Sequence, residues 1–308
     1  MADPRKVFAE VLVELGKQNH KVLAVSCDSG LGSGMGPFRE ALPDQYVEVG
    51  ISEQNAIGIC AGLAVNGFIP VVSAIAPFIS MRCYEQLRDD LGYVEQNVKV
   101  VGSSSGVGQS HLGSTHQAVE DIALMRTIPH MVILNPGDPF EVEMCLRKAV
   151  EHKGPVYIRM PRQGLENMRD PAGRSFEIGK GEVLKEGEIM LLSSGTTSNR
   201  ALQAAAMLEE EGLRVGVLNL PCIWPLDEAL IKKYAQSAKL LVSVEEHSVV
   251  AGLGGAVAEL LAPLPGHAPL HIVGIPAGAK ETGPYEDLLD CYGLTGQKIA
   301  ETVKKLAK

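Results

Sequence analysis

Short apolar runs rich in β-branched residues alternate along this chain with longer stretches in which apolar residues recur at helical spacing. The short runs predict strands over 21–26, 46–50, 71–74, 98–103, 131–135, 156–160, 189–193, 215–220, 240–244 and 271–275. The longer stretches predict helices over 78–92, 117–126, 139–151, 197–211, 227–236 and 254–262, from residues 52, 284 and 295, and at the amphipathic N-terminus. A strand–helix–strand order at this spacing indicates right-handed crossovers and parallel sheets.

The alternation is interrupted between residues 161 and 188, where Gly, Pro and charged residues replace the long apolar stretches. We predict a linker with a small hairpin in this segment. The 308 residues suit two domains of about 150 residues each. The predicted fold class is therefore α/β, with two consecutive three-layer α/β/α domains and mainly parallel sheets. They span 1–165 and 188–308 and are joined by a linker over 166–187.

Composition narrows the possible partners and the compartment. Aromatic residues make up only 5% of the chain, so Val, Ile, Leu and Ala fill the core, as in parallel sheets covered on both faces. The net charge of −9 argues against nucleic acid and against an anionic membrane, but leaves a small anionic substrate open. The six cysteines stand singly, and the N-terminus lacks a signal-peptide pattern. No apolar run approaches the ~20 residues of a membrane span, so we expect a cytoplasmic protein without membrane or nucleic-acid partners.

The loops that follow the predicted strands of the first domain carry the candidate chemistry. Ligands of open parallel sheets bind beyond the carboxyl ends of the strands. Here those loops are 27–37, 50–55, 73–78, 102–116 and 159–164, and they are rich in Gly and Ser. Two His and two Arg residues also fall in them, which favours the first domain as the place of chemistry.

Glu53 is the strongest single candidate for a functional residue in these loops. It opens a predicted helix whose next turns are crowded with Ala and Gly, and such small residues permit close packing against another helix across a subunit interface. One interpretation is structural: Glu53 complements the helix dipole from the first turn, with Ser52 as N-cap. The other is functional: an acid held near an interface cleft. The spacing leaves both open.

Several segments resemble, in order, the transketolase group of thiamine-diphosphate enzymes. The run GISEQNAIGICAGLAVNGFIPVVSA resembles their pyrimidine-binding domain, and IAPFISMRCYEQLRDDLGY, THQAVEDIALMRTIPHMVILNPGDPFEVE and GPVYIRMPRQG follow in the family's order. VEEHSVVAGLGGAVAELL resembles the family's C-terminal domain. The resemblance covers essentially the whole chain. It implies that the first domain is a pyrimidine-binding domain and that thiamine diphosphate is the cofactor.

The resemblance also implies roles for individual residues toward that cofactor. Glu53 matches the catalytic Glu that hydrogen-bonds the aminopyrimidine and promotes the tautomer that deprotonates the thiazolium. His116, in STHQ, matches the catalytic His that faces the aminopyrimidine and the substrate. Phe78 matches an aromatic wall of the pyrimidine pocket, and Ile75 occupies the slot of a second aromatic. Asp28 matches an Asp near the cofactor, or else is an ordinary turn residue.

At the substrate end the match is to residues that bind a sugar phosphate. Arg5, Ser33 and Arg162 fall on these positions, with Arg159 as a neighbour of Arg162. The planar fork of Arg suits bidentate phosphate binding in a way that Lys does not. The structural alternative for each Arg is an exposed salt bridge.

The segment VGSSSGVGQSHLGSTHQ departs from the family pattern. Gly102 or Ser103 occupies the slot of a family His, and Leu112 or a neighbour replaces an acidic pair. His111 is the candidate to replace one of the missing contacts. The substrate therefore need not be an ordinary pentose phosphate.

The family's diphosphate-binding domain has no counterpart here, because no GDG motif occurs in the sequence. In the family this domain anchors the cofactor through Mg²⁺ or Ca²⁺. We therefore predict no metal site in this chain, and interpret it as the C-terminal subunit of a split transketolase, inactive alone. A separate N-terminal, diphosphate-binding subunit would supply the metal ligands, in an α2β2 assembly that transfers a two-carbon ketol unit between sugar phosphates.

Two other hypotheses stay open from the sequence. The chain could be the β-type subunit of a 2-oxoacid dehydrogenase or resemble 1-deoxyxylulose-5-phosphate synthase, although Arg5 and Arg162 favour a phosphorylated sugar. It could also be a noncatalytic regulatory or scaffolding paralogue, which the altered loop favours and Glu53 opposes. Glu245, Glu246 and His247 follow a predicted strand of the second domain, and we predict a packing or interface role for them.

Overall fold

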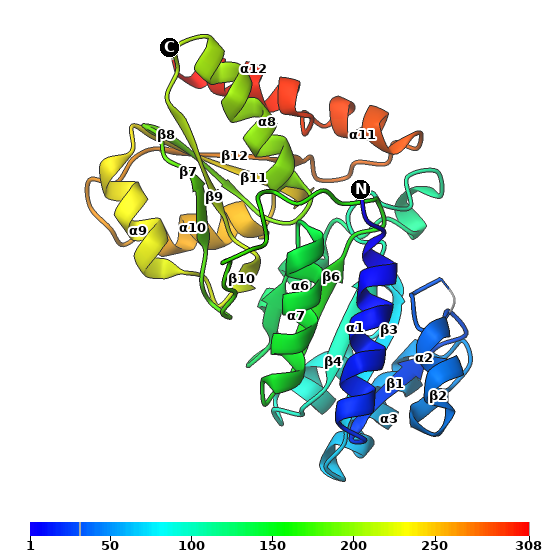
Figure 1. Ribbon diagram of the computed structural model, residues 1–308. Coiled ribbons are helices and arrows are strands. Elements are labelled where there is room, and N and C mark those ends of the chain that lie inside the picture. The colour runs from blue at the N-terminus through cyan, green and yellow to red at the C-terminus, as the bar shows by residue number, and fades with distance from the viewer. Residues whose placement is uncertain (31, 308) are drawn as a thin grey trace.

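A computed structural model describes residues 1–30 and 32–307, and its first unit is built on a seven-stranded sheet (Figure 1). The strands are β1 (Val22–Ser26), β2 (Tyr46–Glu48), β3 (Ile69–Ile75), β4 (Lys99–Ser103), β5 (Val132–Leu134), β6 (Val156–Met160) and β10 (Cys222–Trp224). They lie in the order β10-β5-β6-β4-β3-β1-β2. All pairs are parallel except β10 with β5.

Helices cover both faces of this sheet. On one face pack α1 (Pro4–Gln18), α2 (Gly36–Ala41) and α7 (Pro139–Glu151). On the other pack α3 (Glu53–Val65), α4 (Ala76–Ser80), α5 (Tyr84–Gln86), η2 (Leu87–Gly92) and α6 (Asp121–Arg126), while the short turns η1 (Pro43–Gln45) and η3 (Gly113–Thr115) lie in loops. Alternate strand residues such as Val71 and Val72 enter opposite cores, because successive side chains of a strand point to opposite faces.

The second unit repeats this plan on five strands. These are β7 (Glu182–Lys185), β8 (Ile189–Ser193), β9 (Val215–Asn219), β11 (Leu240–Ser248) and β12 (Leu270–Ile275), in the order β12-β11-β8-β9-β7. Only the edge strand β7 is antiparallel to its neighbour. One face is covered by α8 (Thr197–Glu210), α11 (Tyr285–Cys291) and α12 (Gly296–Leu306), and the other by α9 (Glu228–Ser237) and α10 (Leu253–Leu261).

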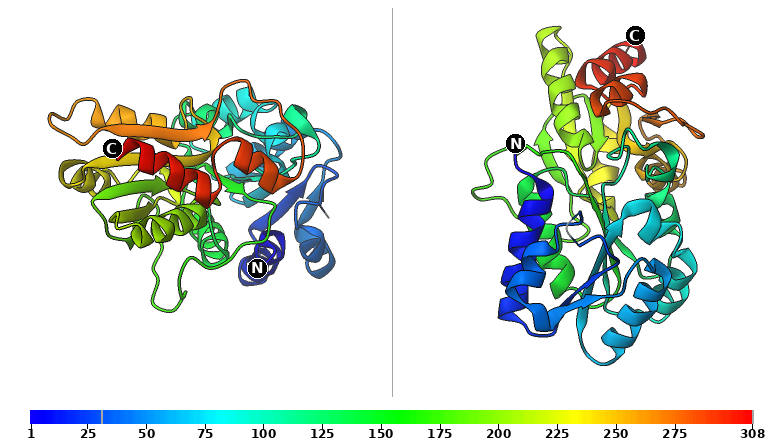
Figure 2. Two further views of the ribbon diagram at one scale, coloured as in Figure 1. Left: turned by 90° about the horizontal axis from the view of Figure 1, so that it is seen from above. Right: turned by 90° about the vertical axis from the view of Figure 1, so that its right-hand side faces the viewer.

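The two units share a core. The chain leaves β9 and returns to the first sheet as β10, so that Cys222 pairs with Leu134 of β5. Around this strand one apolar cluster continues from Tyr157 in the first unit to Leu192 in the second. Both views in Figure 2 show the units packed directly against each other, with the N-terminus close to their junction.

The predicted fold class is confirmed, and α7 and β6 coincide with their predicted ranges. Two details differ. The helix predicted over 78–92 is broken into α4, α5 and the π-helical η2. The predicted linker holds β7, which pairs with β9 in the second sheet, and no hairpin. The domain boundaries stay a prediction. None of the helices in the described residues is long and apolar enough to cross a membrane.

Candidate active site

The carboxyl ends of β1, β3, β4 and β6 meet at one edge of the first sheet, as parallel strands require. Ile75 at the end of β3 lies opposite Ser103 at the end of β4. The loops that follow these strands bear most of the predicted site residues, so the sheet gathers them at one edge.

Glu53 lies in the first turn of α3 with its side chain only 6% exposed. Ser52 precedes it as N-cap, but the Ser52 hydroxyl donates to the carbonyl of Val49 at 2.9 Å and makes no capping hydrogen bond. A buried carboxylate needs a partner, and Arg82 supplies it: its Nη1 donates to Glu53 Oε2 at 2.8 Å. The acid is therefore held at the site edge by a cation that the sequence analysis missed.

Arg82 links Glu53 to the two aromatic groups of the prediction. Its guanidinium carbon lies 4.4 Å from the centroid of the Phe78 ring. That ring contacts His116 edge to face, with 5.1 Å between the centroids. Thr115 Oγ1 lies 2.9 Å from His116 Nδ1 and fixes the imidazole. The structure thus brings Glu53, Phe78 and His116 into one contiguous group.

The same geometry tests whether the residues fit an aminopyrimidine. The Arg82 guanidinium is planar, stacks on Phe78 and donates to the Glu53 carboxylate. A planar ring whose nitrogen or amino group donates a hydrogen bond needs these same two contacts. The residues therefore fit the group. Because Arg82 follows Phe78 by four positions, helical spacing was the sequence signal that could have found it.

Two cysteines next to Glu53 have raised pKa values and are therefore weak nucleophiles. Burial, followed by the charge of Glu53, raises the pKa of Cys27 to about 12. The same two causes raise the pKa of Cys83 to about 12. Both thiols therefore stay protonated at neutral pH.

Asp28 takes a different place from the Glu53 group. Its backbone is in the left-handed region, with φ of 58°, and its N–H donates to Glu48 Oε1 at 2.7 Å. Glu48 also accepts from the N–H of Gly50 at 3.0 Å, which fixes the turn after β1. The Asp28 side chain is exposed at this edge, and Ile75 is half-buried at the start of α4.

Arg5 and Ser33 lie together at the N-terminal end of α1. A Cβ on Gly34, next to Ser33, would lie 2.8 Å from the Arg5 carbonyl oxygen. The Ser33 hydroxyl is buried and has no hydrogen-bond partner among the described residues. A cavity of about 720 Å³ borders Arg5, Lys6 and Gly34. The Arg5 fork is engaged by the Asp3 carboxylate, at 2.8 and 3.1 Å, and must exchange it to bind a phosphate.

Arg162 reaches the same end of the unit. Ala2 pairs with Leu165 in an antiparallel bridge, and Arg5 and Arg162 each lie three residues from this pair on the same side. The Arg162 side chain is exposed, next to Gly108 of the 104–116 loop. The N-terminal segment therefore runs beside the segment that carries Arg162.

Arg159 does not take the predicted role. Its side chain is 3% exposed, and its Nε pairs with Asp121 Oδ2 at 2.9 Å. Its Nη2 donates to the carbonyls of Ala118 at 3.0 Å and Glu246 at 2.8 Å. These bonds commit the guanidinium inside the protein, so Arg159 is a structural residue and the predicted substrate contact is wrong. Its partner Asp121 lies on α6, far away in sequence, and no local sequence pattern predicts this ion pair.

Two further candidates of the 102–116 segment, His111 and Leu112, lie on an exposed turn. His111 is exposed, and Leu112, in the slot of the family's acidic pair, is 55% exposed. Ser103, in the slot of the family His, donates its buried hydroxyl to the carbonyl of Ala74 at 3.1 Å. Ser103 therefore cannot replace a substrate-binding His, while His111 remains accessible.

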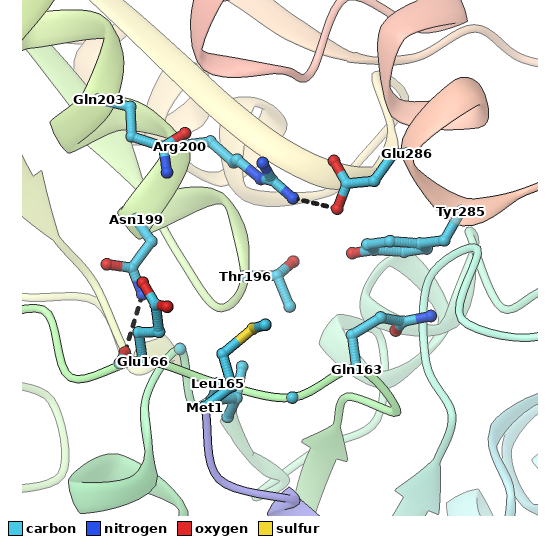
Figure 3. A pocket seen from close by; sticks show the side chains of 12 residues that line it. Met1, Gln163, Leu165, Glu166, Thr196, Asn199, Arg200, Gln203, Tyr285 and Glu286 are labelled. Carbon is cyan, nitrogen blue, oxygen red and sulfur yellow. Dashed lines mark hydrogen bonds and ion pairs between the residues drawn. The ribbon is translucent and has the colours of Figure 1, made fainter.

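A second cavity, of about 440 Å³, lies between the units, and none of the predicted site residues lines it (Figure 3). Arg200 pairs with Glu286 across it at 2.5 Å, and Asn199 donates to the carbonyl of Glu166 at 3.0 Å. Within the described residues, no group of three or more His, Cys, Asp or Glu could hold a metal ion.

Comparison with known proteins agrees with this geometry. The family model of the transketolase pyrimidine binding domain matches residues 1–167, and that of the transketolase C-terminal domain matches residues 179–299. A putative transketolase C-terminal section of Methanocaldococcus jannaschii is 37% identical, over 99% of this chain and 96% of that protein. One of the subunits of the apulose-4-phosphate transketolase of Phocaeicola vulgatus is 36% identical, over 99% of this chain and 97% of that protein.

Among solved structures, one described as a split gene transketolase, inactive beta4 tetramer, superimposes with a TM-score of 0.91 at 37% identity. It matches over 99% of this chain and 98% of that chain. Both domain models and these near full-length matches lead to one conclusion: the chain belongs to the transketolase family.

Proposed function

We propose that the chain is the C-terminal subunit of a split transketolase, and that it transfers a two-carbon ketol unit from a ketose phosphate to an aldose with thiamine diphosphate. The observation that carries the proposal is the group formed by Glu53, Phe78 and His116 at the edge of the first sheet. Near full-length likeness to separately encoded transketolase subunits supports it.

Each residue of this group has a defined task. Bound thiamine diphosphate supplies a stabilised carbanion equivalent, which no side chain can provide. Glu53 holds the proton shared with the pyrimidine ring nitrogen, and its burial excludes the water that would compete for that hydrogen bond. Phe78 orients the ring by stacking. His116 faces the same space and binds or exchanges a proton with a substrate oxygen.

The substrate phosphate would be bound near the N-terminal end of α1, where a cavity borders Arg5. Arg5 and Arg162 offer two forked cations, and the Ser33 hydroxyl, which has no hydrogen-bond partner among the residues that the structure describes, offers a neutral donor. His111 and Asp28, both exposed, would contact sugar hydroxyls or the cofactor. The relative named for apulose 4-phosphate also acts on a phosphorylated sugar, by its name.

The diphosphate of the cofactor and its Mg²⁺ or Ca²⁺ would be held by a separate N-terminal subunit, in an α2β2 assembly. Among the described residues, and apart from the neighbouring backbone of α3 itself, no heavy atom lies within 4 Å of a Cβ added to Gly58 or Gly62, so this helix presents an open face of small residues beside Glu53. A helix with such a face permits close approach of another subunit to the carboxylate.

The test is thiamine-diphosphate-dependent ketol transfer by the chain assembled with its diphosphate-binding subunit. Removing one catalytic carboxylate of this kind costs several kcal/mol of transition-state stabilisation, so Glu53→Gln should lower turnover by about 1,000-fold. Glu210→Gln, an exposed Glu on α8, is the control and should retain full turnover. Near-normal turnover of Glu53→Gln, or transfer from a 2-oxoacid in place of a ketose phosphate, would refute the proposal.

A further inference from the structure

The loop that carries His111 and His116 is built into the second unit at both of its ends. Val107 and Val119 are part of the apolar core that α8, α11 and α12 form on the second sheet. The N–H of Ser248 on β11 donates to the Val119 carbonyl at 2.7 Å. The loop belongs to the first unit in sequence, but its anchors lie in the second.

Glu246 makes the most extensive of these anchoring contacts. Its Oε1 accepts from the N–H of Val107 at 2.8 Å. Its Oε2 accepts from the hydroxyls of Thr196 and Tyr285, each at 2.6 Å. Figure 3 shows these two hydroxyls pointing toward each other from opposite walls of the cavity between the units. Burial and then the charge of Glu246 raise the pKa of Tyr285 well above its usual value, so Tyr285 remains a donor.

The neighbouring backbone is shaped around this carboxylate. A Cβ on Gly106 would lie 2.1 Å from Glu246 Oε1, and Gly106 has φ of +62°, which only glycine adopts at no cost. Gly106 also pairs with Ala118 in an antiparallel bridge that closes the base of the loop. Arg159 donates to the carbonyls of Ala118 and Glu246 together and so ties that base to β11.

The tip of the loop is more exposed, and it also contacts the second unit, since the Ser110 carbonyl accepts from the Gly283 N–H at 3.3 Å. His111, Leu112, Ser114 and Thr115 are all exposed. The position of the loop therefore depends on contacts with the second unit, and at the base of the loop these include the Glu246 side chain.

We propose that Glu246 is a positioning residue: it sets the place of the 107–116 loop, and thereby of His116 and His111 toward the sugar substrate. This inference rests on the proposed function. It gives the second unit, which has no reactive group of its own at the site, a direct part in substrate recognition. Glu246 itself acts through the Val107 N–H and touches no substrate.

The adjacent carboxylate provides a matched comparison. Glu245 lies on the same strand and is equally buried, but it accepts from the N–H groups of Leu253 at 2.6 Å and Gly254 at 2.8 Å, and so caps α10 within the second unit. A change at Glu245 alters a buried carboxylate without touching the loop.

The experiment compares Glu246→Ala, Glu246→Gln and Glu245→Gln in the full chain. Amide hydrogen exchange is measured over 107–116, and KM for the ketose phosphate is measured in the assembly with the diphosphate-binding subunit. With Glu246→Ala we expect exchange at the loop to rise at least ~10-fold, because the Val107 N–H loses its acceptor. We expect KM to rise by about 10-fold, since a displaced loop misplaces its histidines.

Glu246→Gln keeps an oxygen that can accept from Val107, so it should recover most of the loop protection and most of the affinity. Glu245→Gln should leave both loop exchange and KM unchanged even where it lowers the melting temperature. Unchanged loop exchange in Glu246→Ala, or an equal change of loop exchange in Glu245→Gln, would overturn the inference. If the wild-type assembly transfers no ketol unit, the proposed function fails, while the exchange measurement still decides the anchoring.

Discussion

The two units share an architecture but use the carboxyl edges of their strands in opposite ways. In the first unit this edge carries a half-accessible group, in which Arg82 with a side chain 46% exposed covers Glu53. In the second unit the same edge ends in Glu245, Glu246 and His247, none of which is more than 4% exposed. Their side chains cap a helix or contact the first unit. The position beyond a strand is thus necessary for a site, but accessibility decides whether it becomes one.

Burial also separates the two arginines that flank Pro161. Arg159 is enclosed and paired with Asp121, whereas Arg162 is exposed near the proposed phosphate pocket. Arg159→Ala should therefore lower the stability of the fold, whereas Arg162→Ala should weaken substrate binding. The two variants together give the sharpest test of the comparison.

The largest effect is expected for Arg159→Ala. It leaves the Asp121 carboxylate, which is fully buried, without its cation, and breaking a buried pair in this way costs about 3–5 kcal/mol. Urea unfolding of the full chain measures this loss. A variant as stable as the wild type would show that Arg159 is not structural and would reopen its role at the substrate.

His247 should govern stability in acid. Burial lowers the pKa of His247 to about 4 from an ordinary value of 6.5, so the folded chain keeps the ring neutral where the unfolded chain binds a proton. The His247 contribution to stability is therefore lost as the pH falls from about 6.5 to about 4, by about 1.4 kcal/mol for each pH unit, while the raised pKa of Glu245, about 7, acts in the opposite direction. In His247→Gln this part of the acid loss should vanish, which urea midpoints at pH 7 and pH 4.5 would detect. Equal slopes in both proteins would contradict the assignment.

Arg162→Ala is expected to be nearly neutral for folding and to weaken substrate binding. Loss of one forked phosphate contact should raise KM for the sugar phosphate about 10- to 100-fold, and Arg162→Lys should be intermediate because an ammonium cannot bind two oxygens in a fork. Steady-state kinetics with phosphorylated and unphosphorylated donors would check this. Equal losses for both donors would place Arg162 away from the phosphate.

Sequence patterns predicted the local part of the fold well. Asp138 accepts from the Glu141 N–H as the N-cap of α7, and Pro139 follows it. Adjacent residues therefore sufficed to predict where that helix begins. The helix over 78–92 was overextended, since periodicity does not reveal the π-helical turn at Leu87–Gly92. The three residues of β10 are too short for any pattern and pair with a strand far away in sequence.

The site residues divide in the same way, into those that a local motif identifies and those whose partners lie far away in sequence. Glu53, Phe78 and His116 were found by motif, and the structure places them in contact through Arg82. Arg159 was misassigned because exposure, which separates it from Arg162, depends on the packing of α6 and β11 against β6. The proposed role of Glu246 is equally nonlocal, since the groups that donate hydrogen bonds to its carboxylate belong to residues 107, 196 and 285. Long-range partners of this kind are set by the fold and are not encoded next to the residue.

Titration with the diphosphate-binding subunit tests the central claim most directly. A fixed amount of this chain, with thiamine diphosphate, Mg²⁺ and a ketose phosphate donor, is mixed with increasing amounts of that subunit, and ketol transfer to an aldose is measured. We expect no transfer by this chain alone and a rise that saturates at one subunit of each kind. Full turnover without the second subunit, or no turnover at any ratio, would contradict the account.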